Sequence, residues 1–429
     1  MPISVRKRDG DHHGMTGERH SCDILIVGGG PAGMAAATSA AESCSSVIVL
    51  DENAGLGGQI WRGEEHRAAH DEADKWFKKV KNSRIDVRRG VHVFDQPEPN
   101  VIAAEDLQGV AEFSFQKLII ATGARERFLP FPGWTLPNVM GAGGLQALVK
   151  SGMPVAGKRV VVAGSGPLLL AVAAYLKDVG AKVLLIAEQA SFGNVFGFAS
   201  RLIGEPKKLV QAIGLRVKLL GIPYLTECFP VEAVGKEKLT TVKLKHGGKT
   251  LTIDCDFLAC GFHLVPNVEL ALLLGCKTGD GGITVDEFQE TSVPSVYAAG
   301  EVTGIGGVEL SLVEGEIAGL AATDKKERAT GLFAKLAKAR KFAQNMNEAF
   351  ALREELKNIV TPETFVCRCE DVKFGRVKEY GSFREAKLQT RCGMGPCQGR
   401  VCGAALEFLL GWNDRSVRTP VYPVKVENL

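Results

Sequence analysis

The sequence has little that would take it to a membrane or to nucleic acid. No apolar run reaches the roughly eighteen residues that a membrane-spanning helix needs, and residues 1–21 lack the apolar core of a signal peptide. A formal net charge of only +3 in 429 residues gives no reason to expect nucleic acid as a partner. No Ser–His–Asp or Cys–His arrangement is visible, so we assign no general acid or base. We expect a protein of the reducing cytoplasm, with a disordered tail over residues 1–21.

Eleven cysteines are present, and five of them fall in the last fifth of the chain. Cys367 and Cys369 form a Cys-x-Cys pair, and Cys392, Cys397 and Cys402 follow within a short glycine-rich stretch. Cysteines this close together in a chain without secretory features indicate ligands of a soft metal or cluster, not disulfides. No histidine lies among them, which favours an iron–sulfur cluster or zinc. The other six are scattered among apolar residues and are expected to be small buried side chains.

A dinucleotide-binding fingerprint opens the ordered part of the chain. An apolar strand from Cys22 leads into Gly28-Gly29-Gly30-Pro31-Ala32-Gly33, an Ala-rich helix follows, and a second strand ends in Asp51-Glu52. Gly28 permits the tight turn, Gly30 lets the backbone approach a pyrophosphate, and Gly33 allows close packing of helix on strand. The phosphates would lie at the positive end of the helix. Strand, glycines, helix, strand and acid in this order are strongly specific.

A second unit of the same kind begins at Arg159, with Gly164 and Gly166 in its turn. Its fingerprint is degraded, because Leu169 stands at the third glycine position and the acid Glu188 comes one residue late. We expect a second Rossmann unit, and whether it binds NAD(P) stays open.

A third strand, close to Val296, ends in Gly300-Glu301, and a glycine-rich turn and a helix follow. Its return after the second unit predicts an α/β fold with two three-layer, Rossmann-like dinucleotide-binding domains, the second inserted in the first. A small, mainly helical, cysteine-rich iron–sulfur module follows. The expected boundaries are 22–125 with 280–330 for the first domain, 126–279 for the second domain and connector, 331–360 for a helical linker, 361–412 for the cysteine module and 413–429 for an extended tail.

These motifs resemble the two-dinucleotide-binding-domain flavoproteins. The matching stretches are Gly28 to Gly33, Gly57-Gly58-Gln59, Ala121-Thr122-Gly123 and Ala299-Gly300-Glu301, with glutamate where aspartate is usual. The variant second turn and the cysteine motifs narrow the likeness to the FAD and iron–sulfur subunits of heteromeric amine dehydrogenases. Opine oxidase, hydroxyproline dehydrogenase and hydrogen cyanide synthase have such subunits, in which a bacterioferritin-associated-ferredoxin-like module holds a [2Fe–2S] cluster.

The resemblance implies a set of cofactor contacts. The turn would wrap the FAD pyrophosphate, Asp51 would bind the adenosine ribose, Gln59 would lie near the isoalloxazine, and Glu301 would bind the ribityl chain. The full set of implied cofactor residues is Gly28, Gly30, Pro31, Ala32, Gly33, Asp51, Glu52, Gly58, Gln59, Ala121, Thr122, Gly123, Gly300 and Glu301, with Gly164 and Gly166 for a second nucleotide.

For the cluster, the family pattern is Cys-x-Cys followed by Cys-x₄-Cys. We favour Cys367, Cys369, Cys397 and Cys402 as ligands, because relatives with alanine at the Cys392 position otherwise resemble this loop. The pair Cys392 with Cys397 also fits the spacing, so Cys392 in place of Cys402 stays open. A structural zinc site is the alternative metal.

The leading hypothesis for function is an electron-transfer subunit. A flavin oxidase-like partner subunit would oxidise an amino or imino acid, and the electrons would leave this chain to a quinone, dye or other acceptor. A self-sufficient NAD(P)H-dependent flavin reductase is the second hypothesis, and a non-enzymatic iron or redox sensor is the third. The substrate would lie on the partner, so this sequence does not name it.

Overall fold

The first sheet carries the opening glycine turn. In this computed structural model, residues 18–428 are described, except 45, 64, 66–70, 280, 414 and 415. The strand order is β3-β2-β1-β6-β5-β4, with β19 added on the other side of β6. Strands β1, β2, β6 and β19 run parallel. They are apolar because alanine-rich helices pack on one face, while Leu270, Ala271 and apolar side chains of β4 and β5 pack on the other. The bounds are β1 Glu18–Val27, β2 Val47–Asp51, β3 Asp86–Arg89, β4 His92–Glu98, β5 Val101–Glu105, β6 Val110–Ile120 and β19 Val296–Ala298.

Strand β1 begins at Glu18, four residues before the start that the apolar pattern predicted. Residues 18–22 are mostly polar, but they pair in register with Ala111–Phe115 of β6. Arg19 also forms an ion pair with Glu98 at 2.9 Å. Backbone pairing extends the strand beyond its apolar stretch, so the expected tail over 1–21 is wrong from Glu18 onward. Residues 1–17 lie outside the described part.

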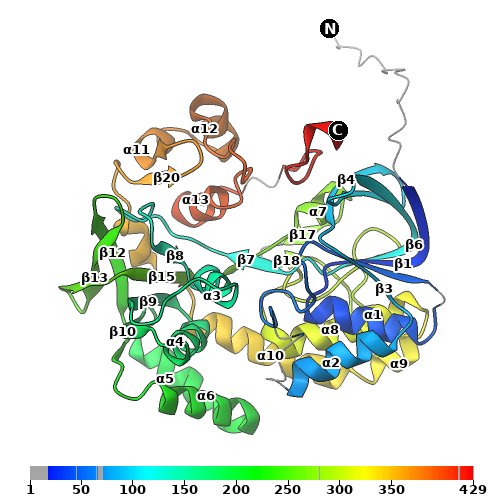
Figure 1. The fold of residues 1–429 in the computed structure, drawn as a ribbon, viewed down its shortest axis with the longest axis horizontal. Coiled ribbons are helices and arrows are strands. Elements are labelled where there is room, and N and C mark those ends of the chain that lie inside the picture. The colour runs from blue at the N-terminus through cyan, green and yellow to red at the C-terminus, as the bar shows by residue number, and fades with distance from the viewer. Residues whose placement is uncertain are drawn as a thin grey trace.

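Two helices pack in parallel beneath this sheet (Figure 1). They are α1 (Pro31–Ala41) and α8 (Gly307–Ala322). A Cβ on Gly315 would lie 2.2 Å from the carbonyl oxygen of Ala32, and one on Gly319 would lie 2.3 Å from that of Ala36. The small residues of both helices therefore allow backbone-to-backbone contact. Helices α2 (Asp71–Asn82) and α9 (Lys326–Thr330) lie on the same side.

The second sheet has the order β11-β10-β9-β15-β8 and is parallel throughout. Its strands are β8 Val139–Gly141, β9 Arg159–Ser165, β10 Lys182–Glu188, β11 Tyr224–Leu225 and β15 Phe257–Phe262. Helices α3 (Ala142–Lys150), α4 (Leu168–Asp178), α5 (Phe192–Arg201) and α6 (Pro206–Lys218) and a small antiparallel sheet of β12 (Cys228–Gly235), β13 (Leu239–His246) and β14 (Lys249–Asp254) complete it.

The chain enters and leaves this second domain side by side. Strand β7 (Ala124–Glu126) leads in, β16 (Leu264–Pro266) leads out, and the two pair antiparallel. After β16 come α7 (Glu269–Leu273), β17 (Thr278–Gly279), β18 (Gly282–Ile283) and then β19 of the first sheet. The predicted insertion of the second domain in the first is confirmed.

The last part of the chain contains a long helix and the cysteine module. Helix α10 (Phe333–Ala349) and a 3₁₀ turn (Glu354–Ile359) precede β20 (Phe365–Cys367), β21 (Val372–Lys373), α11 (Phe374–Val377), α12 (Phe383–Thr390) and α13 (Cys402–Leu410). The segment after residue 415 returns to the first domain, where the Val421 N–H donates to the Phe94 carbonyl at 2.7 Å. Among the described residues, no helix has both the length and the apolar character to cross a bilayer.

Candidate cofactor sites

The turn between β1 and α1 is built from backbone contacts that only glycine permits. Gly28 has φ +111°, and a Cβ there would lie 2.2 Å from the carbonyl oxygen of Ala121 on β6. A Cβ on Gly33 would lie 1.8 Å from the carbonyl oxygen of Gly28, so helix α1 is held directly against the turn. Gly30 and Pro31 begin the helix, no side chain caps it, and both are partly exposed. The first N–H groups of α1 are therefore available to an anion.

Asp51 lies at the end of β2, beside this turn. One carboxylate oxygen accepts the Gly29 N–H at 2.5 Å, and the other accepts the Asn53 backbone N–H at 2.7 Å. These bonds fix the carboxylate at the turn, where a ribose would lie next to the pyrophosphate. Glu52 points into solvent. Arg62 donates to the Asn53 side chain at 2.7 Å, while its Nε is buried without a hydrogen-bond partner among the described residues.

The Gly57–Gly58–Gln59 segment packs on the same turn. The Gly57 N–H donates to the Gly29 carbonyl at 2.9 Å, and a Cβ on Gly58 would lie 3.1 Å from the Cα of Gly30. Gln59 follows as an exposed side chain. Gly57 and Gly58 thus contact the glycine turn between β1 and α1, while the Gln59 side chain is exposed.

The Ala121–Thr122–Gly123 segment is held by Asn267, which the sequence did not single out. The Thr122 hydroxyl donates to the Asn267 carbonyl at 2.8 Å, and the Asn267 side chain donates to the Thr122 carbonyl at 2.9 Å. Gly123 adopts φ +66°. Asn267 directly follows β16, so its contact exists only because the inserted domain returns the chain to this point.

Gly300 and Glu301 lie at the start of the last segment of the first domain. Gly300 has φ +85°, and a Cβ there would lie 2.7 Å from the Ala32 side chain. Its N–H donates to Glu314 at 3.1 Å, a buried acid that sequence reasoning missed because it lies inside the apolar helix α8. Burial raises the pKa of Glu301, while the Gly307 N–H, at the start of α8, opposes that shift.

These contacts fit FAD. Helix α8 contacts Ala32 of α1 through Gly315, eight residues after its own start at Gly307. Ala32 is the second residue of α1, so the two helix starts are offset by seven residues, and at 1.5 Å per residue the N-terminus of α8 lies about 10 Å beyond the start of α1. Two helix N-termini offset along one line offer anion sites at two points of an extended cofactor. The uncapped α1, the fixed Asp51 and the unpartnered Arg62 Nε are consistent with a bound dinucleotide.

The second glycine turn makes the same close contact with its neighbouring strand as the first turn, but not the close contact with its helix. A Cβ on Gly164 would lie 1.9 Å from the Gly261 carbonyl oxygen, the same contact that Gly28 makes with Ala121. Leu169 at the third position is fully buried in the core of this domain, so α4 does not approach its turn as α1 does.

The acid of this second unit is not displaced. Glu188 pairs with Gly164, and a bulge between Val183 and Leu185 in β10 absorbs the extra residue. The Glu188 carboxylate accepts the Gly166 N–H at 2.7 Å and the Ala190 N–H at 2.8 Å. Burial raises the pKa of Glu188 to about 7.

Three cysteines meet inside the cysteine module. The sulfur atoms of Cys367, Cys392 and Cys402 all lie within 4.8 Å of one another and are buried. The thiols of Cys392 and Cys402 hydrogen-bond to Cys367, which lowers the pKa of the Cys367 thiol. Cys392 therefore belongs to this group of thiols as much as Cys402 does. It directly follows Arg391, whose left-handed conformation ends α12.

Cys369 and Cys397 form a second, more exposed pair. The backbone N–H and the thiol of Cys397 both hydrogen-bond with Cys369. A Cβ on Gly395 would lie 2.3 Å from the Cys369 side chain, so this glycine lets the loop close over it. A buried group of three and an exposed pair offer five thiols, which suits a thiolate-ligated cluster or zinc.

Arg400 joins the cysteine module to the first domain. It lies between Cys397 and Cys402, and its carbonyl accepts the Arg125 Nε–H at 3.3 Å. Arg125 also forms an ion pair with Glu269 at 2.8 Å and donates to the Asn267 side chain at 2.8 Å. The cysteine loop is therefore fixed beside the residues that hold Thr122 and Gly123.

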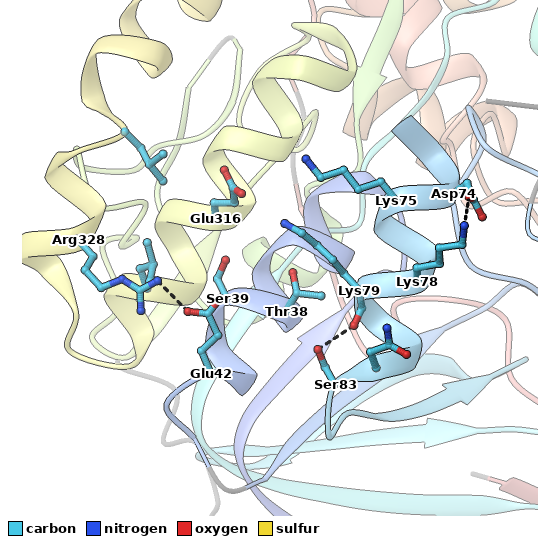
Figure 2. Close-up of a pocket in the computed structure, with 13 residues that line it drawn as sticks. Thr38, Ser39, Glu42, Asp74, Lys75, Lys78, Lys79, Ser83, Glu316 and Arg328 are labelled. Atoms are coloured by element: carbon cyan, nitrogen blue, oxygen red, sulfur yellow. Dashed lines mark hydrogen bonds and ion pairs between the residues drawn. The ribbon is translucent and has the colours of Figure 1, made fainter. Parts of the chain in front are cut away.

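Two grooves lie away from the first glycine turn. One of them, of about 690 Å³, lies between α1, α2 and α8. Figure 2 shows the side chains that line it. Among these, Lys78 pairs with Asp74 at 2.6 Å and Arg328 pairs with Glu42 at 2.7 Å. These two ion pairs join four of the charged side chains that line it, and we assign it no ligand. Another, of about 760 Å³, lies beside β18 and α10 with Glu314 and Arg340 in its wall.

Comparison with known proteins agrees with this geometry. Residues 22–321 match the family model described as pyridine nucleotide-disulphide oxidoreductase. The chain belongs to this family. It is an FAD-dependent oxidoreductase. It is 31% identical to the HcnB subunit of hydrogen cyanide synthase from Pseudomonas aeruginosa, over 93% of this chain and 96% of that protein. It is 28% identical to one of the opine oxidase subunits of Agrobacterium tumefaciens, over 95% of this chain and 91% of that protein.

Solved structures share the fold. L-proline dehydrogenase from P. horikoshii superposes with a TM-score of 0.67 at 17% identity, over 96% of this chain and 80% of that chain. Thioredoxin reductase from T. acidophilum superposes with a TM-score of 0.54 at 25% identity, over 72% of this chain and 99% of that chain. The whole of the second protein thus corresponds to less than three quarters of this one.

Proposed function

We propose that this chain is the FAD- and [2Fe–2S]-containing electron-transfer subunit of a heteromeric amino- or imino-acid dehydrogenase. A flavin oxidase-like partner would carry the substrate, as for an opine or a hydroxyproline-like acid. Oxidation of an amine to an imine releases two electrons and two protons, and the electrons would pass through this chain to a quinone, dye or similar acceptor. The names of its relatives, which are subunits of an oxidase and of a synthase, support this assignment.

The observation that carries the proposal is the position of Arg400. This residue belongs to the loop between Cys397 and Cys402, and it contacts Arg125 and Glu269 of the first domain. Arg125 is two residues beyond Gly123, a proposed FAD contact. A thiolate site fixed next to a flavin domain has the arrangement that electron transfer needs. A structural zinc site would not require that neighbour.

We assign the cluster to Cys369 and Cys397 together with Cys367 and either Cys402 or Cys392, with Cys402 preferred. A bound flavin supplies the redox chemistry, while the residues of this chain bind and orient it.

Anaerobic purification followed by visible and low-temperature EPR spectra tests the proposal. We expect oxidised flavin bands, about two irons per chain, and a rhombic signal on dithionite reduction. Flavin with zinc and no EPR signal would leave the cysteines structural and end the electron-transfer assignment. Capture of an oxidase-like flavoprotein that reduces this chain with an amino acid would identify the partner.

A further inference from the structure

The residues of the second Rossmann domain do not fit the nicotinamide nucleotide that the family implies. We propose that Phe350–Arg353 of the same chain occupy its dinucleotide crevice, so that the domain binds no NAD(P). This rests on the proposed function and extends it: if the second domain binds no NAD(P), the electrons that reach the flavin must come from a protein partner.

The two glycine turns differ in what covers them. Gly28 and Gly30 are partly exposed, whereas Gly164, Ser165 and Gly166 are all buried. A Cβ built on Gly166 would lie 3.9 Å from the ring of Phe350, whereas one on Gly30 would have only the Cα of Gly58 within 4 Å, at 3.8 Å. The phenyl ring therefore lies where a pyrophosphate would approach the second glycine.

Residues 350–353, the covering segment, are held by hydrogen bonds from their backbone to side chains of the second domain. The Phe350 carbonyl accepts the Ser165 hydroxyl at 2.7 Å and the Gln189 side chain at 3.3 Å. Gln189 also donates to the Ala351 carbonyl at 3.1 Å and accepts the Arg353 N–H at 3.1 Å. Ser165 belongs to the turn and Gln189 follows the acid Glu188, so the groups next to a nucleotide position are committed to this segment.

His263 provides a second, independent contact to the covering segment. The register of β15 on β9 places His263 where the first domain has Gly123. Gly123 has φ +66° and His263 has φ +65°, a left-handed conformation that is unfavourable for a residue with a side chain. The His263 imidazole lies against the Phe350 carbonyl as a further hydrogen-bond partner.

Phe350 is also anchored from behind. It is 4% exposed, and its ring packs edge-on against Phe198 of α5 at 5.2 Å between centroids. It directly follows helix α10, whose packing on α8 fixes the point at which the chain enters the crevice. Together with Leu169, which keeps α4 away from the turn, these contacts leave no cradle for a pyrophosphate.

Anaerobic titration of the FAD-loaded full chain with NADH and with NADPH tests the closure. We expect no flavin bleaching and no binding by calorimetry in the micromolar range. The amide of Arg353 should be protected from hydrogen exchange, equally with and without nucleotide. Micromolar binding to the wild-type chain, or fast exchange at Arg353, would overturn the proposal.

A double variant, Phe350→Ala with His263→Gly, removes the ring and the imidazole from the crevice. We expect its affinity for NADH to rise by at least about tenfold, while Phe342→Ala, which removes a ring that packs on Phe198 from α10, leaves it unchanged. A double variant no better than wild type would overturn the role of this segment.

Two further outcomes separate this proposal from the proposed function. A purified chain that contains no iron and binds no nucleotide would refute the electron-transfer function and support the closed crevice. A chain that contains the cluster and whose flavin is bleached by NADH would support the electron-transfer function and refute the closed crevice.

Discussion

Gly33 lies against Gly28 so closely that a Cβ on Gly33 would be 1.8 Å from the Gly28 carbonyl oxygen. Gly33→Ala must therefore push α1 away from the turn that would bind the FAD pyrophosphate. We expect loss of most bound flavin and destabilisation of about 3 kcal/mol, measured as flavin absorbance per chain and by thermal unfolding. Gly197→Ala in α5, where a Cβ meets nothing within 4 Å, should keep the flavin content and should not lower the stability. Full flavin content in Gly33→Ala would contradict the predicted contact.

The five cysteines are separable by substitution. We expect Cys367→Ala to abolish iron binding, because Cys367 contacts both other buried thiols. Cys392→Ala should keep about two irons per chain. Cys402→Ala should keep iron with a changed EPR spectrum, because Cys392 can take its place, and the double variant should lose it. Iron analysis and EPR decide; loss of iron in Cys392→Ala alone would make Cys392 the native ligand.

Arg125 holds the cysteine module on the first domain. Arg125→Met removes its ion pair with Glu269 and its bond to the Arg400 carbonyl. We expect a cost of about 2 kcal/mol, since hydrogen bonds to charged groups are worth that much, together with faster hydrogen exchange in residues 361–412. Arg19→Met breaks an exposed pair with Glu98 and should change neither. Unchanged exchange in Arg125→Met would show that the module is held elsewhere.

Glu188 makes stability depend on pH. Its folded-state pKa is raised to about 7 from an ordinary value of 4.5, so its contribution is present below pH 4.5 and is lost as the pH rises through 7. Over that interval the loss is on the order of 3 kcal/mol. Glu188→Gln should flatten this part of the profile, as measured by urea unfolding at pH 5 and pH 7.5. An equally steep profile in the variant would show that Glu188 is not the group responsible.

The geometry of the first glycine turn was largely predictable because its contacts are local. Gly28, Gly33 and Asp51 belong to one β-α-β unit, and the residue types that its geometry needs stand at fixed spacing. Leu169 likewise marked the second turn as altered. The sequence pattern placed Glu188 one residue late, but a bulge in β10 brings it to the expected position beside the turn. Such a bulge cannot be recognised in a pattern of apolar residues.

Contacts made over long distances along the chain were not predictable. Asn267 reaches Thr122 only because the inserted domain leaves beside the point where it entered. Phe350 looks like an ordinary apolar residue at the end of an amphipathic helix, and only the tertiary structure places it over Gly166. The polar start of β1 was missed for the same reason, because its partner strand lies about ninety residues later.

The covering segment also sets an order of events during synthesis. The inserted domain has all the strands of its sheet once residue 262 has been made, and the first domain needs β19 at residues 296–298. Phe350 follows both, so the crevice above Gly166 is without its cover while both sheets can already form on the ribosome. For that interval the nascent chain presents a glycine turn that the finished protein keeps closed.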